Sequence, residues 1–370
     1  MSATEREVAG RLATEIARLA GEEHVRFMEV CGGHTHTIYR YGIPSLLPEN
    51  VEFVHGPGCP VCVIPMGRVD DAIALATEET VTLCCFGDLL RVPGGRGSLM
   101  EARAEGADVR IVYSPLDALA LAEREPDRQV VFLAVGFETT APATALTVLR
   151  AAARGVANFS VLCNHVTIEE PLRALLGAPG VALDGLIGPG HVAVVTGAAA
   201  FGFVAKEFSL PIVVSGFEPN DLLESVAMLL RQRHSGRWRA ENQYRRAVSD
   251  EGNLAAQAVM AQVFTRRARF AWRGLGEIER SAYGLREEFS RFDAERRFAV
   301  PGITVPDPRA CRCGEVLRGV RKPWQCGVFG TACTPERPIG TCMVSSEGAC
   351  AAYYHYGRLG GLRREPAVGR

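Results

Sequence analysis

Val25-Arg-Phe-Met-Glu-Val-Cys-Gly-Gly-His-Thr-His36 is the stretch that decides the fold. It begins with a short run of β-forming residues and passes directly into two glycines and a polar turn. The same order, a strand followed by a turn and an amphipathic helical stretch, repeats up to about residue 218. Such alternation is typical of βαβ units, in which right-handed helical crossovers join parallel strands. The sequence therefore predicts an α/β protein.

Eight short runs are predicted strands: residues 25–30, 51–55, 81–86, 109–113, 130–135, 159–163, 185–187 and 212–214. Amphipathic helical patterns follow several of them, at residues 68–77, 115–124, 140–154 and 169–176. Eight strands would form either one large sheet or two sheets of about four. Two similar halves would explain why the pattern at residues 27–33 is echoed at 132–138, although such matches also arise by chance.

The character of the chain changes after the last predicted strand. Residues 221–298 show no obvious strands and are interpreted as helices rich in Arg and Glu, with Trp272, Tyr283 and Phe289 as packing anchors. Residues 300–308 contain prolines that stop a helix and indicate a linker. The predicted domains are residues 1–125, 126–225 and 226–370, where the first two can exchange segments.

The composition excludes several classes of protein. The chain has 370 residues, 47% of them hydrophobic and 22% charged, which is typical of a globular protein of two or three domains. The formal net charge of −1 gives no reason to expect nucleic acid or an anionic membrane as the main partner. Residues 1–18 lack the apolar segment of a signal peptide, and the longest apolar run, 192–205, is too short to span a bilayer. We therefore expect a cytoplasmic location.

The twelve cysteines are the most informative residues. In a reducing compartment, clustered cysteines serve as metal ligands or redox thiols more often than as structural disulfides. Six of the twelve lie between Cys311 and Cys350. By contrast, Cys84, Cys85 and Cys163 lie in predicted strands, where a buried cysteine acts as a small hydrophobic residue.

Cys31-Gly-Gly-His-Thr-His36 directly follows the first predicted strand. In open α/β sheets, ligands bind beyond the carboxyl ends of strands, and glycines let the backbone approach a ligand closely. A helix starting near His34 would favour the Cys31 thiolate over the thiol. One cysteine with two histidines suits iron, zinc or copper. The alternative is a buried cysteine with two surface histidines on a turn.

His55-Gly-Pro-Gly-Cys-Pro-Val-Cys62 also follows a predicted strand. At a helix start, Cys59 and Cys62 can form a reversible disulfide or chelate a metal, and the helix dipole would lower the pKa of the first thiol. Half of a zinc knuckle is the alternative, but no second pair follows at the required spacing. Further along, Glu138 and the hydroxyls of Thr139 and Thr140 could line the same cleft.

The tail contains six cysteines: Cys311, Cys313, Cys326, Cys333, Cys342 and Cys350. A segment so often interrupted by glycine and proline usually needs a metal to hold its shape. Four thiolates would bind a cluster and two would remain for a redox pair. Zinc is the alternative, but the tail has no paired Cys-x-x-Cys knuckles, which favours an iron–sulfur cluster.

Together these motifs resemble the HypD family of [NiFe]-hydrogenase maturation proteins. The matching segments are Glu29-Val-Cys-Gly-Gly-His-Thr-His36, His55-Gly-Pro-Gly-Cys-Pro-Val-Cys62, Gly136-Phe-Glu-Thr-Thr-Ala-Pro142, Asn164-His-Val-Thr-Ile168, Cys333-Thr-Pro-Glu and Cys342-Met-Val-Ser-Ser-Glu-Gly-Ala-Cys350. The resemblance runs from about residue 25 to about residue 356, with no departure at a cysteine. It implies two similar Rossmann-like parallel-sheet domains and a C-terminal helical, cysteine-rich domain that holds a [4Fe–4S] cluster.

The resemblance also implies a function. HypD-like proteins are assembly scaffolds rather than conventional turnover enzymes, and with the small partner HypC they carry the iron that becomes the Fe(CN)2CO moiety. Cyanide comes from the thiocyanate-bearing C-terminus of HypE. By resemblance, Cys31 is a ligand of that iron and His34 assists nearby. Cys59 and Cys62 then form a redox dithiol or act as further iron ligands.

The tail resembles the catalytic subunit of ferredoxin:thioredoxin reductase. That resemblance implies a redox pair, Cys313 and Cys342, and a cluster bound by four other cysteines: Cys311, Cys326, Cys333 and Cys350. Two other hypotheses remain. One is a general thiol–disulfide oxidoreductase that uses Cys59 and Cys62, and the other is a zinc-stabilised binding module without a redox role.

Overall fold

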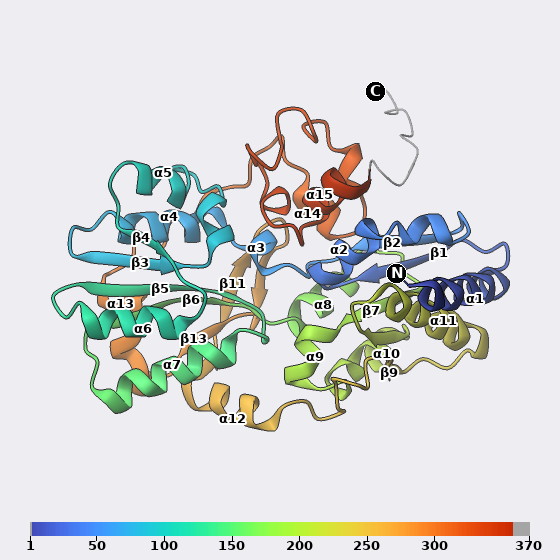
Figure 1. The fold of residues 1–370 in the computed structure, drawn as a ribbon, viewed down its shortest axis with the longest axis horizontal. Helices are drawn as coiled ribbons and strands as arrows, with labels where there is room; N and C mark the ends of the chain where they lie inside the picture. Colours follow the sequence, from blue (N-terminus) through green and yellow to red (C-terminus); the bar gives the residue numbers. More distant parts are fainter. Residues whose placement is uncertain (1, 358–370) are drawn as a thin grey trace.

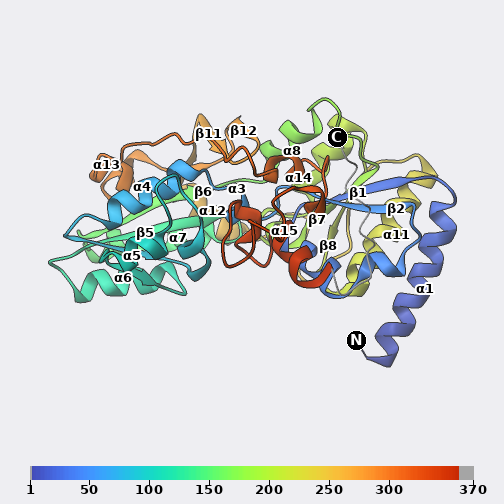
Figure 2. The same ribbon diagram turned by 90° about the horizontal axis from the view of Figure 1, so that it is seen from above.

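The computed structural model describes residues 2–357 and contains two α/β units side by side, with the cysteine-rich tail over their junction (Figure 1). The view from above confirms this arrangement, with the tail between the two units (Figure 2). Among the described residues, no single helix is long and apolar enough to cross a membrane. One sharply bent helix pair, Gly190–Thr196 with Ala199–Phe208, reaches the required length and composition only when the two helices are taken together.

The first sheet has five parallel strands in the order β2-β1-β7-β8-β9. They are β1 (Val25–Glu29), β2 (Val51–His55), β7 (Gly185–Pro189), β8 (Ile212–Ser215) and β9 (Ala240–Asn242). Helices α1 (Ala3–Ala20) and α11 (Pro219–Ser235) share one buried apolar cluster with this sheet, so they cover one of its faces. The other helices of this unit are α2 (Gly32–Arg40), α9 (Gly190–Thr196) and α10 (Gly202–Phe208).

The second sheet has four parallel strands in the order β4-β3-β5-β6. They are β3 (Val81–Cys85), β4 (Val109–Ile111), β5 (Gln129–Gly136) and β6 (Phe159–His165). Alternate residues of β5 enter two different buried clusters, because successive side chains of a strand point to opposite faces. Helices α4 (Met66–Ala76) and α5 (Leu99–Ala104) share one cluster, whereas α6 (Pro115–Arg124) and α7 (Ala141–Arg154) share the other.

All eight predicted strands and all four predicted helices are confirmed, with small shifts at their ends. They form two Rossmann-like parallel sheets rather than one large sheet. The chain leaves the first sheet after β2, builds the second sheet and returns at β7. A division at residue 125 therefore separates β3 and β4 from β5 and β6, although one sheet unites them. Strand alternation alone carries no information about which strands pair.

The prediction of a purely helical segment at residues 221–298 is wrong. After α11 and β9 come α12 (Leu254–Val263) and four short antiparallel strands: β10 (Phe264–Arg266), β11 (Arg269–Trp272), β12 (Gly276–Glu279) and β13 (Tyr283–Leu285). Strands of three or four residues are too short to show a clear twofold pattern. Buried residues such as Phe270 and Trp272 do alternate with exposed ones, but only over a single short strand, and the many Arg and Glu residues favoured a helical interpretation.

The remaining elements are short and connect the larger ones. They are α3 (Pro60–Val63), α8 (Glu169–Leu176), α13 (Ala294–Arg297), α14 (Cys313–Leu317), α15 (Ala349–Ala352), a π-helical turn (Tyr353–Gly357) and 3₁₀ turns at Ile43–Leu46, Gly87–Arg91, Ala199–Phe201, Glu287–Phe292, Pro323–Gln325 and Thr341–Met343. Residues 300–308 have no regular structure, as the prolines predicted. Leu317, Cys342 and Val344 of the tail belong to the same buried cluster as Cys59 and Cys62. The tail is therefore packed onto the α/β units.

Candidate functional site

Cys31 lies at the carboxyl end of β1 and is the N-cap residue of α2. Its backbone N–H donates a hydrogen bond to Glu29 Oε2 at 3.0 Å. The loop from β2 crosses it so closely that a Cβ atom on Gly58 would lie 2.2 Å from the Cys31 nitrogen. Only glycine fits at this crossing, which explains the glycine of the second motif.

Glu29 is the centre of a buried polar network below Cys31. Its carboxylate accepts a hydrogen bond from the Thr35 hydroxyl and lies 2.6 Å from His55 Nδ1. His55 Nε2 in turn lies 2.7 Å from the Tyr39 hydroxyl. This network ties the ends of β1 and β2 to α2. Sequence reasoning did not assign Glu29, although a carboxylate at the end of a predicted strand, two residues before Cys31, was a usable signal.

A cavity of about 500 Å³ opens beside Cys31, between the two units. It is lined by the strand ends and connecting segments of both sheets, including Cys31, Asp88, Thr139 and His191, and by Glu347 of the tail. The carboxyl ends of parallel strands are the usual place for a ligand in such folds. Thr139 and Thr140 line this cavity, as predicted.

His191 is the histidine next to Cys31, with Nδ1 3.9 Å from the Cys31 sulfur. His34 Nε2 lies 3.2 Å from the Ser215 carbonyl oxygen, and its Nδ1 has no partner. Burial lowers the pKa of His34 to about 4, so its ring is neutral at pH 7. Phe217 stacks on both imidazoles, with ring centroids 4.7 Å from His34 and 3.7 Å from His191. His34 therefore contacts the site through this stack.

The prediction that Cys31 is a thiolate is wrong for the protein alone. Burial, followed by the nearby Glu347 carboxylate, raises the pKa of the Cys31 thiol. These effects outweigh the helix N-terminus, so the thiol of the protein alone is protonated at pH 7. A bound metal ion would reverse this balance, because a coordinating thiol gives up its proton. Sequence reasoning also missed Glu347, which lies within the last cysteine motif.

Cys59 is the N-cap residue of the single-turn helix α3, Cys62 lies within this helix, and both are buried. They do not line the cavity beside Cys31 but lie towards the tail. The Thr341 hydroxyl donates a hydrogen bond to the Cys62 carbonyl oxygen at 2.5 Å. Burial, and then the thiols of Cys342 and Cys59, raise the pKa of Cys62. The dithiol is therefore in contact with a tail cysteine.

The tail cysteines gather around one small cavity of about 20 Å³. Its lining includes Cys311, Cys313, Cys326, Cys333, Cys342 and Cys350. The sulfurs of Cys313 and Cys342 are 2.6 Å apart. The pKa of Cys342 is lowered because the thiols of Cys313 and then Cys62 donate hydrogen bonds to its sulfur. Cys59, Cys62, Cys342 and Cys313 thus form a continuous line of neighbouring thiols.

The surroundings of this cavity fit an iron–sulfur cluster in their donor chemistry. Four cysteines other than Cys313 and Cys342 line the cavity. The Ile339 N–H donates a hydrogen bond to the Cys333 sulfur at 3.4 Å, and hydrogen bonds of this kind help to set the reduction potential of such clusters. A Cβ atom on Gly340 would lie 2.4 Å from the Cys311 sulfur, so glycine keeps the space open. Within residues 2–357, no three His, Cys, Asp or Glu side chains are gathered closely enough to hold a single metal ion.

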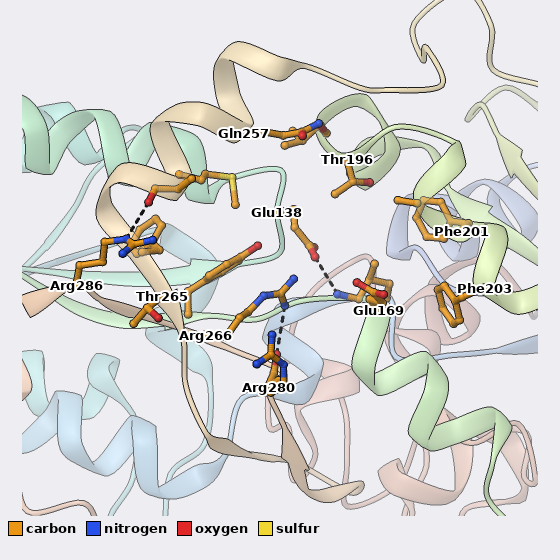
Figure 3. A pocket seen from close by; sticks show the side chains of 17 residues that line it. Glu138, Glu169, Thr196, Phe201, Phe203, Gln257, Thr265, Arg266, Arg280 and Arg286 are labelled. Atoms are coloured by element: carbon orange, nitrogen blue, oxygen red, sulfur yellow. Dashed lines mark hydrogen bonds between the residues drawn. The ribbon is translucent and has the colours of Figure 1, made fainter. Parts of the chain in front are cut away.

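The remaining predicted residues lie elsewhere. Cys84, Cys85 and Cys163 are fully buried in β3 and β6, which confirms them as core residues. Glu138 faces away from Cys31 and lines a second cavity (Figure 3). Its neighbours Phe137 and Thr139 line the first. Successive residues of this segment therefore point to opposite sides.

Two linked Rossmann-like units that share a cavity beside Cys31, with a thiol-rich tail next to it, define a cysteine-rich α/β protein. The family model HypD, described as the hydrogenase formation hypA family, matches residues 7–357. The chain is 53% identical over 360 residues to a hydrogenase maturation factor HypD of Rhodobacter capsulatus, covering 95% of this chain and 96% of that protein. It is 54% identical over 336 residues to that of Escherichia coli K12, covering 90% of each. The chain therefore belongs to the HypD family of hydrogenase maturation factors.

Proposed function

We propose that this protein, together with the small protein HypC, is the scaffold on which the Fe(CN)2CO moiety of [NiFe]-hydrogenases is assembled. The observation that carries the proposal is the Cys31 thiol, which lines a cavity between both sheets at 3.9 Å from His191. Iron is the cargo of this site, and a cysteine of HypC shares it. The buried Glu29 network keeps Cys31 in place while cargo enters and leaves.

Cyanide is delivered by HypE as a thiocyanate. Conversion of that group to a thiol and a cyanide ion consumes two electrons. A dithiol that closes to a disulfide supplies two, and Cys59 and Cys62 are the pair nearest to Cys31 along the loop from β2. The line of thiols from Cys59 to Cys313 supports reduction of the resulting Cys59–Cys62 disulfide by exchange with Cys342 and Cys313, which then become a disulfide in its place.

The tail is proposed to bind a [4Fe–4S] cluster through Cys311, Cys326, Cys333 and Cys350. When bound, such a cluster supplies electrons one at a time. Cys313 and Cys342 are the adjacent redox pair. We place the protein in the cytoplasm, where thiols stay reduced.

The decisive experiment is co-purification with HypC, followed by infrared spectroscopy of the complex. The intact protein should show cyanide and carbonyl stretching bands, and Cys31→Ala should lose them. Cys84→Ala, which removes a core thiol, is the matched control and should keep them. Persistent bands in Cys31→Ala would refute Cys31 as the iron ligand.

Two further variants separate the roles of the dithiol. If Cys59 and Cys62 act as electron donors, Cys59→Ala and Cys62→Ala should retain iron but lack cyanide bands. Loss of iron in these variants would identify them as ligands instead.

Chemical analysis tests the cluster independently. Anaerobically purified protein should be brown and contain roughly four irons and four acid-labile sulfides in the tail. Cys333→Ala should lower both together. One or two zinc ions without labile sulfide would contradict the cluster.

A general thiol–disulfide oxidoreductase is not favoured. The chain belongs to a hydrogenase maturation family over almost its whole length, and Cys59 and Cys62 are only 4% and 1% exposed. A dithiol so buried cannot dock onto arbitrary protein disulfides. Without HypC, the protein should therefore fail to reduce insulin disulfides.

A further inference from the structure

The second cavity lies on the other side of the segment that follows β5. It has a volume of about 500 Å³ and is lined by α12, β10, β13 and the beginning of α8 (Figure 3). Glu138 points into it, whereas Phe137 and Thr139 line the cavity beside Cys31. Val195 lines both cavities. None of the cysteines contributes to this second cavity, so it is separate from the proposed iron site.

Three arginines line this cavity: Arg266, Arg280 and Arg286. Arg266 donates a hydrogen bond to the Arg280 carbonyl oxygen at 3.3 Å, and Arg286 donates one to the Ala261 carbonyl oxygen at 2.8 Å. Within the described part of the chain, none of the three forms an ion pair with a carboxylate; Glu169, the other acidic group at the cavity, is paired with Arg173 at 2.6 Å. The cavity therefore offers guanidinium groups to an anion.

Glu138 adds a polar group that lacks a partner. The side chain is 3% exposed; its Oε1 accepts a hydrogen bond from the Ile168 N–H at 3.2 Å, and its Oε2 has no partner. Figure 3 shows this carboxyl group close to the Arg266 guanidinium among the lining side chains. Burial raises the pKa of Glu138 to about 7. In its neutral form the carboxyl group can donate a hydrogen bond to a ligand oxygen.

Part of the wall is apolar. Phe201, Phe203, Met260 and Phe264 contribute to it. A cavity of this size that combines apolar side chains with a few convergent polar groups is typical of a site for a small organic molecule. Guanidinium groups recognise carboxylates and phosphates through paired hydrogen bonds.

We propose that this cavity binds a small amphipathic oxyanion, a carboxylate or phosphate group joined to an apolar body. The oxyanion contacts Arg266 and Arg280, the unpaired oxygen of Glu138 faces it, and the apolar body packs against the phenylalanines. Because the segment from Gly136 to Thr140 forms part of both cavities, the ligand is in a position to influence the geometry beside Cys31.

The test uses the full chain and three probes: phenyl phosphate, phenylacetate and inorganic phosphate. Isothermal titration and thermal unfolding should show saturable binding of phenyl phosphate or phenylacetate. The tighter of the two assigns the head group. Inorganic phosphate should bind at least tenfold more weakly, because it lacks the apolar body.

The variants Arg266→Gln and Arg280→Gln should each weaken binding about tenfold or more. Arg269→Gln is the matched control, because it removes the same charge from the neighbouring hairpin, where Arg269 pairs with Glu279. Glu138→Gln keeps a side chain that can donate a hydrogen bond at this position and should retain binding at pH 7. Circular dichroism of each free variant checks that the fold is intact.

The proposal is overturned if neither organic probe binds saturably. It is also overturned if folded Arg266→Gln and Arg280→Gln bind as tightly as Arg269→Gln. Neither result bears on the iron site, since the cavity beside Cys31 is unchanged in these variants.

Discussion

The loop and tail cysteines differ from the strand cysteines more in their neighbours than in their burial, although Cys311, Cys326 and Cys350 are only partly buried. Cys62 and Cys342 are each 1% exposed, and Cys84 and Cys163 are fully buried. Burial raises the pKa of Cys84 to about 12 just as it raises the pKa of Cys62. The strand cysteines, however, are surrounded by apolar side chains, whereas the loop and tail cysteines contact other thiols and line cavities. Burial therefore does not separate the strand cysteines from the others here, but lining a cavity or contacting another thiol does.

The largest loss of stability is expected from substitution of Glu29, which supports the loop region, that is, the segments after β1 and β2 that carry Cys31, Cys59 and Cys62. Glu29→Ala should lower the free energy of unfolding by about 3–5 kcal/mol, because it leaves His55 Nδ1 and the Cys31 N–H buried without a partner. Urea unfolding measures this loss. Glu49→Ala, at an exposed position of the same unit, should change it by less than about 0.5 kcal/mol. Equal effects of the two substitutions would show that the network does not support the loop.

Acid pH should lower the stability of the protein through two buried histidines, one in the loop region and one in the strands of the second sheet. Burial lowers the pKa of His34 in the loop region and of His165 in β6 to about 4. Between about pH 6.5 and pH 4 the unfolded chain binds these protons and the folded chain does not, so stability falls as pH falls, by about 3 kcal/mol per histidine. Urea unfolding as a function of pH should show a shallower decline in His34→Phe and in His165→Phe.

Glu138 should act in the opposite direction in the same titration. The pKa of Glu138 is raised to about 7, so the folded state holds a proton that the unfolded state has lost between about pH 4.5 and pH 7. Glu138→Gln removes this contribution and should steepen the loss of stability in acid. A profile that all three variants leave unaltered would contradict the assigned directions.

Gly58→Ala should lower the free energy of unfolding by distorting the backbone of the loop region. The added Cβ would lie 2.2 Å from the Cys31 nitrogen and 2.3 Å from the Val30 carbonyl carbon, so the backbone must shift. We expect a loss of about 1–3 kcal/mol in unfolding free energy. Gly10→Ala in α1 meets nothing within 4 Å and should instead stabilise the protein by about 0.5–1 kcal/mol.

The smallest stability effect is expected from the strand cysteines. Cys84→Ala and Cys163→Ala should each cost about 1 kcal/mol, the transfer free energy of a small buried side chain. Mild oxidation with diamide should form a disulfide between Cys313 and Cys342, because their sulfurs are 2.6 Å apart. The two strand substitutions should not change this product. Cys342→Ala should abolish that link in peptide mass spectrometry. A diamide product that joins two strand cysteines would contradict the distinction between the two regions.

Up to about residue 218, the sequence by itself determined the order of strands and helices, because strand and helix periodicities are local properties of the chain. It also determined the motif cysteines and the family, since these are carried by short contiguous segments. Only the tertiary structure decided that β3 to β6 form their own sheet and that four short strands follow α12. It alone brought His191 and Glu347 to Cys31, and Cys342 to Cys62. Those contacts join residues far apart in the chain, and their geometry depends on packing that no local pattern encodes.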